Sequence, residues 1–138
     1  KIHSLPQDRA YYTPVFDRIV LPLSSQFTSA EDYWSTLLHE LVHSTGHAKR
    51  LNREGIVSSG GSYGDERYAF EELIAEMGSA FLCAQLGVTG NVQHENYIGA
   101  WLKILRADKK ALFSACRQAR EATEYLLSVH DTPAEKAA

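Results

Sequence analysis

The chain has 138 residues, of which 44% are hydrophobic and 22% charged, a composition ordinary for one globular domain. The formal net charge of -3 leaves no basic footprint, so we expect this domain itself to bind no nucleic acid. No apolar run reaches the roughly 18–20 residues of a membrane-spanning helix, and no signal peptide opens the sequence, so the expected location is the cytoplasm. Cys83 and Cys116 form no disulfide framework and are expected to be buried, reduced thiols.

The N-terminal part has the composition of a β-hairpin. Residues 10–12 and 17–21 are rich in β-branched and aromatic side chains, and Pro14 between them suits a turn. We predict two antiparallel strands, the second ended by Pro22, with Tyr11 and Tyr12 in an edge strand.

Helices are predicted for the rest of the chain. The first begins near Thr28, where Thr28-Ser29-Ala30-Glu31 fits a capping box, and it ends at about Thr45, before Gly46. Glycines and serines over residues 52–65 predict a long loop. Three more helices are expected over residues 66–85, 93–107 and 108–129, followed by a disordered tail over 130–138. The sequence thus predicts one α+β domain, residues 1–138, with a small N-terminal sheet followed by about four helices.

The first predicted helix carries His39-Glu40-Leu41-Val42-His43, an H-E-x-x-H pattern. A helix turns about 100° per residue, which places the two histidines one turn apart, opposite an apolar side. That apolar side carries Trp34, Leu37, Leu38, Leu41, Val42 and Thr45. Two imidazoles at this spacing can reach one Zn²⁺ at about 2.0–2.1 Å. Because the pattern is short and also occurs by chance, its meaning depends on a third ligand.

Glu40 has a different task from the histidines. One step round the helix from His39, it cannot easily bind the same ion, but it can reach a water molecule there. Zinc lowers the pKa of such a water towards 7, and a neighbouring carboxylate can take the proton and later return it to a leaving amine.

A third histidine ligand is not supplied by the residues that follow the motif. In the metzincin pattern it would fall at Lys49, so that pattern fails. His47 comes directly after Gly46, where the helix is expected to end, so we expect it at the rim of the site, where it could contact substrate. Arg50-Leu51-Asn52-Arg53 is expected to be a solvated basic turn.

Acidic residues of the second predicted helix remain as ligands. Glu72 and Glu76 lie one turn apart at the margin of its apolar face, whereas Glu71 is expected to point to solvent. A carboxylate at the edge of a core is costly unless it is paired or bound to metal. We therefore choose Glu72 as the third ligand and Glu76 as the carboxylate that accepts the free N–H of a ligating histidine. The exchange of these two roles, and a structural bridge to Arg or Lys, stay open as alternatives.

Together these two segments resemble the thermolysin-like branch of the zincins, in which a glutamate on a following helix is the third ligand and an acidic residue four positions later bonds a zinc histidine. More closely, "DRAYYTPVFDRIVLP", "TLLHELVHSTGHAKRLNR", "GDERYAFEELIAEMGSAFLC" and "YIGAWLKILRADKKALFSA" resemble the zincin-like metallopeptidase domain at the C-terminus of ArdC-type antirestriction proteins and TraC-type plasmid primases. The resemblance implies a preceding single-strand-DNA-binding domain, a bacterial mobile element, and protection of incoming DNA from restriction.

We therefore predict a zinc-dependent metallopeptidase that acts on a protein or peptide substrate, with Glu40 as general base. Mn²⁺ or another divalent ion could also occupy a site of two histidines and one carboxylate. Tyr63 and Tyr68, which flank the glycine-rich loop, are candidates to donate to an oxyanion. The alternative is a non-proteolytic protein-binding module with a structural metal, although such a module would not need Glu40.

Overall fold

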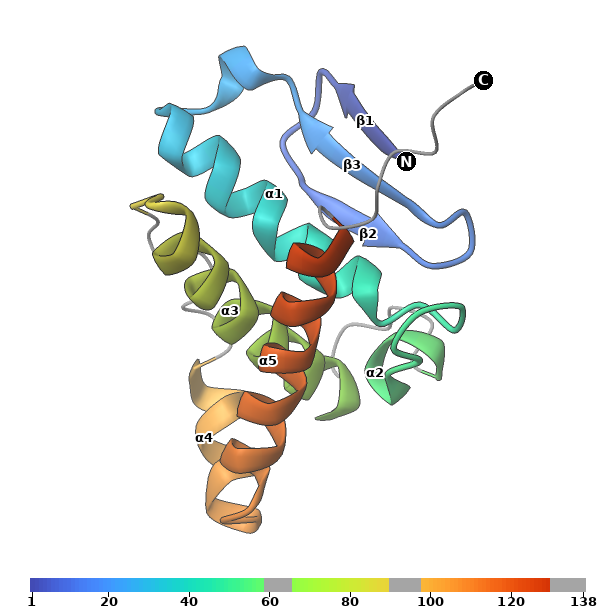
Figure 1. Ribbon diagram of the computed structural model, residues 1–138, viewed down its shortest axis with the longest axis vertical. Coiled ribbons are helices and arrows are strands. Elements are labelled where there is room, and N and C mark those ends of the chain that lie inside the picture. The colour runs from blue at the N-terminus through green and yellow to red at the C-terminus, as the bar shows by residue number, and fades with distance from the viewer. Residues whose placement is uncertain (59–65, 90–97, 130–138) are drawn as a thin grey trace.

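A computed structural model describes residues 1–58, 66–89 and 98–129 of the chain (Figure 1). The elements within these ranges are β1 (Ile2–Leu5), β2 (Tyr11–Thr13), β3 (Arg18–Pro22), the 3-10 turn η1 (Ser24–Gln26), α1 (Ala30–Thr45), α2 (Glu54–Val57), α3 (Glu66–Leu86), α4 (Ile98–Ala107) and α5 (Ala111–Ser128). The predicted α+β class is confirmed. The predicted tail over 130–138 lies outside the described residues.

The sheet has the strand order β1-β3-β2. β2 and β3 pair antiparallel, with Tyr11 opposite Val20, which confirms the predicted hairpin and places β2 at an edge. β1 pairs parallel with β3, with Ile2 opposite Ile19, and the sequence did not predict it. Because all four residues of β1 are exposed, the strand has no buried face that could leave an alternating pattern.

Helix α1 lies between the sheet and the helices α3 and α5 (Figure 1). On the sheet side, Leu37 packs against Ile19 and Leu21. On the other side, Leu38 and Val42 join the main core with residues of α3 and α5. Since both sides of α1 are covered, His39 and His43 are buried as well as Leu37, Leu38 and Val42.

The ends of the helices differ by a few residues from the predictions. The N-cap of α1 is Ser29, not Thr28, and its hydroxyl accepts the Asp32 amide at 3.1 Å. The C-cap is Gly46, where the sequence predicted the end. The predicted loop over 52–65 contains the short helix α2, and its residues 59–65 lie outside the described part. α3 ends before Gly87, whose φ of 71° suits glycine.

Small side chains allow the helices to pack closely. A Cβ atom at Gly78 of α3 would lie 2.9 Å from Cγ2 of Val42 on α1. On α5, the buried residues are alanines at positions 111, 115, 119 and 122, together with Thr123. The sequence predicted that both cysteines are buried. Cys83 is buried, but Cys116 lies outside this buried set and is exposed, so the prediction is wrong for Cys116.

Trp34 belongs to the predicted apolar side of the first helix, but its side chain is half-exposed near the start of α1, where it meets Tyr33 edge to face. Among the described helices, none is long and apolar enough to cross a membrane.

Candidate metal centre

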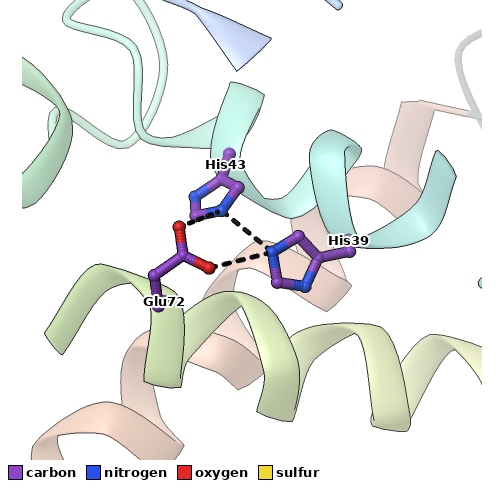
Figure 2. A group of neighbouring side chains, drawn as sticks. All are labelled: His39, His43 and Glu72. Atoms are coloured by element: carbon purple, nitrogen blue, oxygen red, sulfur yellow. Dashed lines mark hydrogen bonds and ion pairs between the residues drawn. The ribbon is translucent and has the colours of Figure 1, made fainter. Parts of the chain in front are cut away.

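Three buried side chains meet between α1 and α3. His39 and His43 project from one helix and Glu72 from the other, towards a common point (Figure 2). The two Nε2 atoms are 3.0 Å apart. Glu72 places Oε2 at 3.3 Å from Nε2 of His39 and Oε1 at 3.3 Å from Nε2 of His43. The exposed fractions of the three residues are only 3%, 6% and 3%.

The spacing of these atoms fits one divalent metal ion. Ligands at about 2.0–2.1 Å from a tetrahedral zinc ion lie about 3.3 Å from one another, close to the distances in this group. Two imidazoles and one carboxylate also form a donor set that leaves a position open for water or substrate. The three side chains can therefore hold one metal ion, as the sequence predicted.

The electrostatics of the group favour a cation. Burial disfavours the charged form of Glu72, yet the imidazoles of His43 and His39 hold the pKa of its carboxyl well below the usual range. Burial also opposes a positive charge on His43, but Glu72 and Glu71 hold the pKa of its imidazole well above the usual value. The carboxylates of the group thus draw positive charge to it, which a bound divalent cation would also supply.

Each imidazole turns its other ring nitrogen towards a carboxylate. Nδ1 of His39 lies 3.5 Å from Oε1 of Glu76, which is the position that the sequence predicted for Glu76. Nδ1 of His43 lies 3.2 Å from Oε1 of Glu71. The prediction that Glu71 points to solvent is wrong, since this residue is fully buried.

Glu71 is buried where the side chain of Arg53 lies against it. The guanidinium of Arg53 donates from Nε to Oε2 of Glu71 at 2.9 Å and from Nη2 to Oε1 at 2.6 Å. Arg53 was expected in a solvated turn, but only 5% of it is exposed. A helical wheel for α3 alone cannot show this cover, because Arg53 comes from the segment that follows α1.

Glu40 lines a pocket next to one of the candidate ligands. It is buried, and together with His39 it lines a pocket of about 180 Å³ beside the metal ligands. The other residues that line this pocket are Asp8, Ala10, Pro22, Phe27 and Thr36. The Glu40 carboxylate also contributes to the raised pKa of the His43 imidazole, so its charge is felt at the centre. A buried carboxylate and an adjacent pocket therefore lie beside the candidate ligand His39.

The remaining predicted site residues have different positions. Tyr68 is half-buried on α3, one turn before Glu72, while Tyr63 lies outside the described residues. His47 is not part of the metal-ligand group. Its Nδ1 accepts the Lys49 amide at 3.1 Å and its carbonyl accepts the Arg50 amide at 2.8 Å, so it organises the turn after α1.

A two-histidine, one-carboxylate group between two helices, next to a small sheet, defines a zincin-like domain. The chain belongs to the family described as zincin-like metallopeptidase, whose sequence model matches residues 1–118. It is 42% identical over 122 residues to the DNA primase TraC of Escherichia coli, an alignment that covers 88% of this chain and 11% of TraC. An uncharacterised protein of Sinorhizobium fredii is 36% identical over 120 residues, with 86% of this chain and 38% of that protein covered.

Solved structures of the antirestriction protein ArdC from plasmid R388 have the same fold. The Mn(II)-bound structure matches with a TM-score of 0.87 and 37% identity, over 97% of this chain and 49% of that one. The metal-free structure matches with a TM-score of 0.81 and 41% identity, over 93% of this chain and 45% of that one. The chain thus spans about half of ArdC and about a tenth of TraC, and it is a zincin-like domain of the kind that both contain.

Proposed function

We propose that this domain hydrolyses peptide bonds with a divalent metal ion held by His39, His43 and Glu72. The observation that carries the proposal is the group of ligand atoms 3.0–3.3 Å apart, with Glu40 buried in the pocket beside them. A structural metal site needs no such carboxylate, whereas hydrolysis needs a base within reach of the attacking water.

Each residue of the centre has a part in this chemistry. A bound divalent ion would acidify water and polarise a carbonyl group. Glu40 accepts the proton of the attacking water and returns it to the departing amine. Glu76, whose Oε1 lies 3.5 Å from Nδ1 of His39, would accept the N–H of that ring and keep it oriented. Tyr68, one turn before Glu72, is a candidate donor to the carbonyl oxygen as negative charge develops on it.

The relatives suggest where this reaction would be used. ArdC is an antirestriction protein of a plasmid, and its structure was solved with Mn(II), so both Zn²⁺ and Mn²⁺ are ions to test here. We infer that the domain serves in the cytoplasm of a bacterium, as part of a mobile-element protein that protects incoming DNA. Its partner is a protein or peptide substrate, and DNA contacts belong to a separate single-strand-binding domain.

The test is the variant Glu40→Gln, which removes the base and leaves the proposed ligands in place. The zinc-loaded or manganese-loaded protein is incubated with a library of proteome-derived peptides, and new termini are identified by mass spectrometry. We expect the variant to bind metal like the wild type and to lose about 10²- to 10⁴-fold in cleavage rate. Equal cleavage by both proteins, or none by the wild type with either ion, would refute the proposal.

The second candidate is a protein-binding module that interferes with restriction without cleavage. It is favoured by the depth at which the ligands are buried, since a closed metal site can serve a structural purpose. If Glu40→Gln retains full protection of transferred DNA in cells, the binding module is the better description.

A further inference from the structure

The segment after α1 carries a buried arginine that makes four hydrogen bonds within the fold. Besides its two bonds to Glu71, Arg53 donates from Nη1 to the Thr45 hydroxyl at 2.6 Å and from Nη2 to the Val42 carbonyl at 2.7 Å. Both acceptors belong to the last turns of α1, on either side of His43 in the sequence. Arg53 therefore ties Glu71 of α3 to the same helical turns that carry a proposed metal ligand.

Two glycines make room for this arrangement. A Cβ atom at Gly46 would lie 2.6 Å from Cγ1 of Ile56 and 3.0 Å from Nη2 of Arg53. A Cβ atom at Gly55 would lie 2.6 Å from Cβ of Glu71. Since real Cβ atoms do not approach other atoms so closely, glycine at both positions lets the Arg53 segment lie directly against α1 and α3.

The Glu71 carboxylate can act on the tautomer of His43. An ionised carboxylate only accepts hydrogen bonds, so the ring nitrogen that faces it must carry the proton. Glu71 faces Nδ1, at 3.2 Å, while Nε2 faces His39 and Glu72. With the proton on Nδ1, the lone pair of Nε2 is directed to the point where the three ligand atoms converge.

We propose that Glu71 and Arg53 are positioning residues of the metal centre. Glu71 holds the His43 ring in the tautomer and orientation that bind metal, and Arg53 holds Glu71 in place. This inference rests on the metal ligands of the proposed function but does not depend on peptide hydrolysis. It gives His43 an outer carboxylate, Glu71, and His39 another, Glu76, so that each imidazole has its own.

The experiment compares the affinity for Zn²⁺ of graded variants, measured by competition with a chelator. Glu71→Gln keeps an acceptor for Nδ1 but loses its charge, and we expect a zinc Kd about 10-fold higher. The double variant Glu71→Leu/Arg53→Met removes the acceptor together with the buried charge pair, and we expect a Kd about 100-fold higher. Arg50→Gln is the matched control, because Arg50 lies three residues away and pairs with Asp17 instead. Its Kd should stay within about twofold of the wild type.

The double variant separates positioning from a merely structural role. An apolar pair of similar volume often stabilises a fold as well as a buried ion pair does, so the metal-free double variant should unfold at a similar urea concentration to the wild type. Weak zinc binding by this stable variant supports the inference. The inference is overturned if the double variant binds Zn²⁺ as tightly as the wild type. It is also overturned if zinc affinity falls only in those variants whose metal-free form is unfolded.

The same titrations test the proposed centre separately. If the wild type binds no zinc, the metal centre itself fails. If the wild type and the double variant bind zinc equally, only the positioning role of Glu71 and Arg53 fails. Nuclear magnetic resonance of the zinc-loaded proteins gives a second measurement, since the Nδ1 proton of His43 should exchange slowly with water in the wild type and faster in the double variant.

Discussion

The carboxylate of Glu72 reaches from α3 to both histidines of α1 at the candidate metal centre. One oxygen lies 3.3 Å from the His39 ring and the other 3.3 Å from the His43 ring. Glu76 lies at 3.5 Å from the far nitrogen of His39 and is more exposed, with 15% of its side chain accessible. These positions fit the proposed ligand role of Glu72 and the proposed orienting role of Glu76, and the two roles can be tested separately by substitution.

We expect Glu72→Gln to weaken zinc binding by more than about 100-fold, because it removes a charged ligand and not only its support. Glu76→Gln should weaken binding by about 10- to 100-fold, the range typical of a residue that orients a ligand. Isothermal titration of each metal-free variant with Zn²⁺ measures both values. A larger loss in Glu76→Gln than in Glu72→Gln would exchange the two roles.

At the scale of elements, helical periodicity in the sequence was enough to locate α1 and α3 and to bring His39, His43, Glu72 and Glu76 to facing sides. The prediction failed where a second element covers a residue, as Arg53 covers Glu71. A helical wheel describes one helix, whereas burial depends on every neighbour of that helix. Gly46 and Gly55 are the sequence features connected with the burial of Glu71, because glycine at these positions leaves room for the Arg53 segment. A sequence alone does not show which atoms approach a glycine closely, so neither residue could have been interpreted in this way.

The contact between α1 and α3 also sets the distance between the ligands that they carry. Gly78→Ala would place a Cβ atom 2.9 Å from Cγ2 of Val42, a fully buried and stiff β-branched side chain. Overpacking costs about 1–3 kcal/mol, while the higher helix propensity of alanine returns up to about 1 kcal/mol. We therefore expect the free energy of unfolding to fall by about 1 kcal/mol, as measured by urea unfolding.

Gly99 of α4 provides the matched control for this substitution. A Cβ atom at Gly99 would have no atom of the described residues within 4 Å, so Gly99→Ala should be neutral or stabilising by up to about 1 kcal/mol. If Gly78→Ala were as harmless as Gly99→Ala, close packing of α1 on α3 would not constrain the metal centre.

In the molecule as a whole, the sheet and the helices are joined by an apolar contact and by a polar one. The apolar contact is that of Leu37 with Ile19 and Leu21. The polar contact joins the turn between β2 and β3 to the segment after α1. In it, Arg50 pairs with both carboxylate oxygens of Asp17, and the Tyr12 hydroxyl donates to Asp17 at 2.8 Å. Because this tie is partly exposed, we expect it to contribute modestly and to depend on pH.

The hydrogen bond from Arg50 holds the pKa of Asp17 well below its ordinary value of 3.8, against the opposing effect of burial. A carboxyl with a lowered pKa stabilises the folded state above its unfolded pKa and loses that effect as the pH falls towards the folded value. Asp17→Asn tests this, and asparagine tolerates the positive φ of 45° at this position. Since 41% of the Asp17 side chain is exposed, we expect the variant to lose no more than about 1 kcal/mol of unfolding free energy at pH 7.

The pH dependence of this loss distinguishes the ion pair from a simple contact. In urea unfolding followed by tryptophan fluorescence, the difference between the wild type and Asp17→Asn should shrink as the pH is lowered from 5 to 3. Glu121→Gln serves as the control, because it breaks only the exposed pair with Arg117 on α5 and should change the unfolding free energy by about 0.3–0.5 kcal/mol. A difference for Asp17→Asn that stays constant down to pH 3 would mean that the charge of Asp17 does not hold the sheet to the helices.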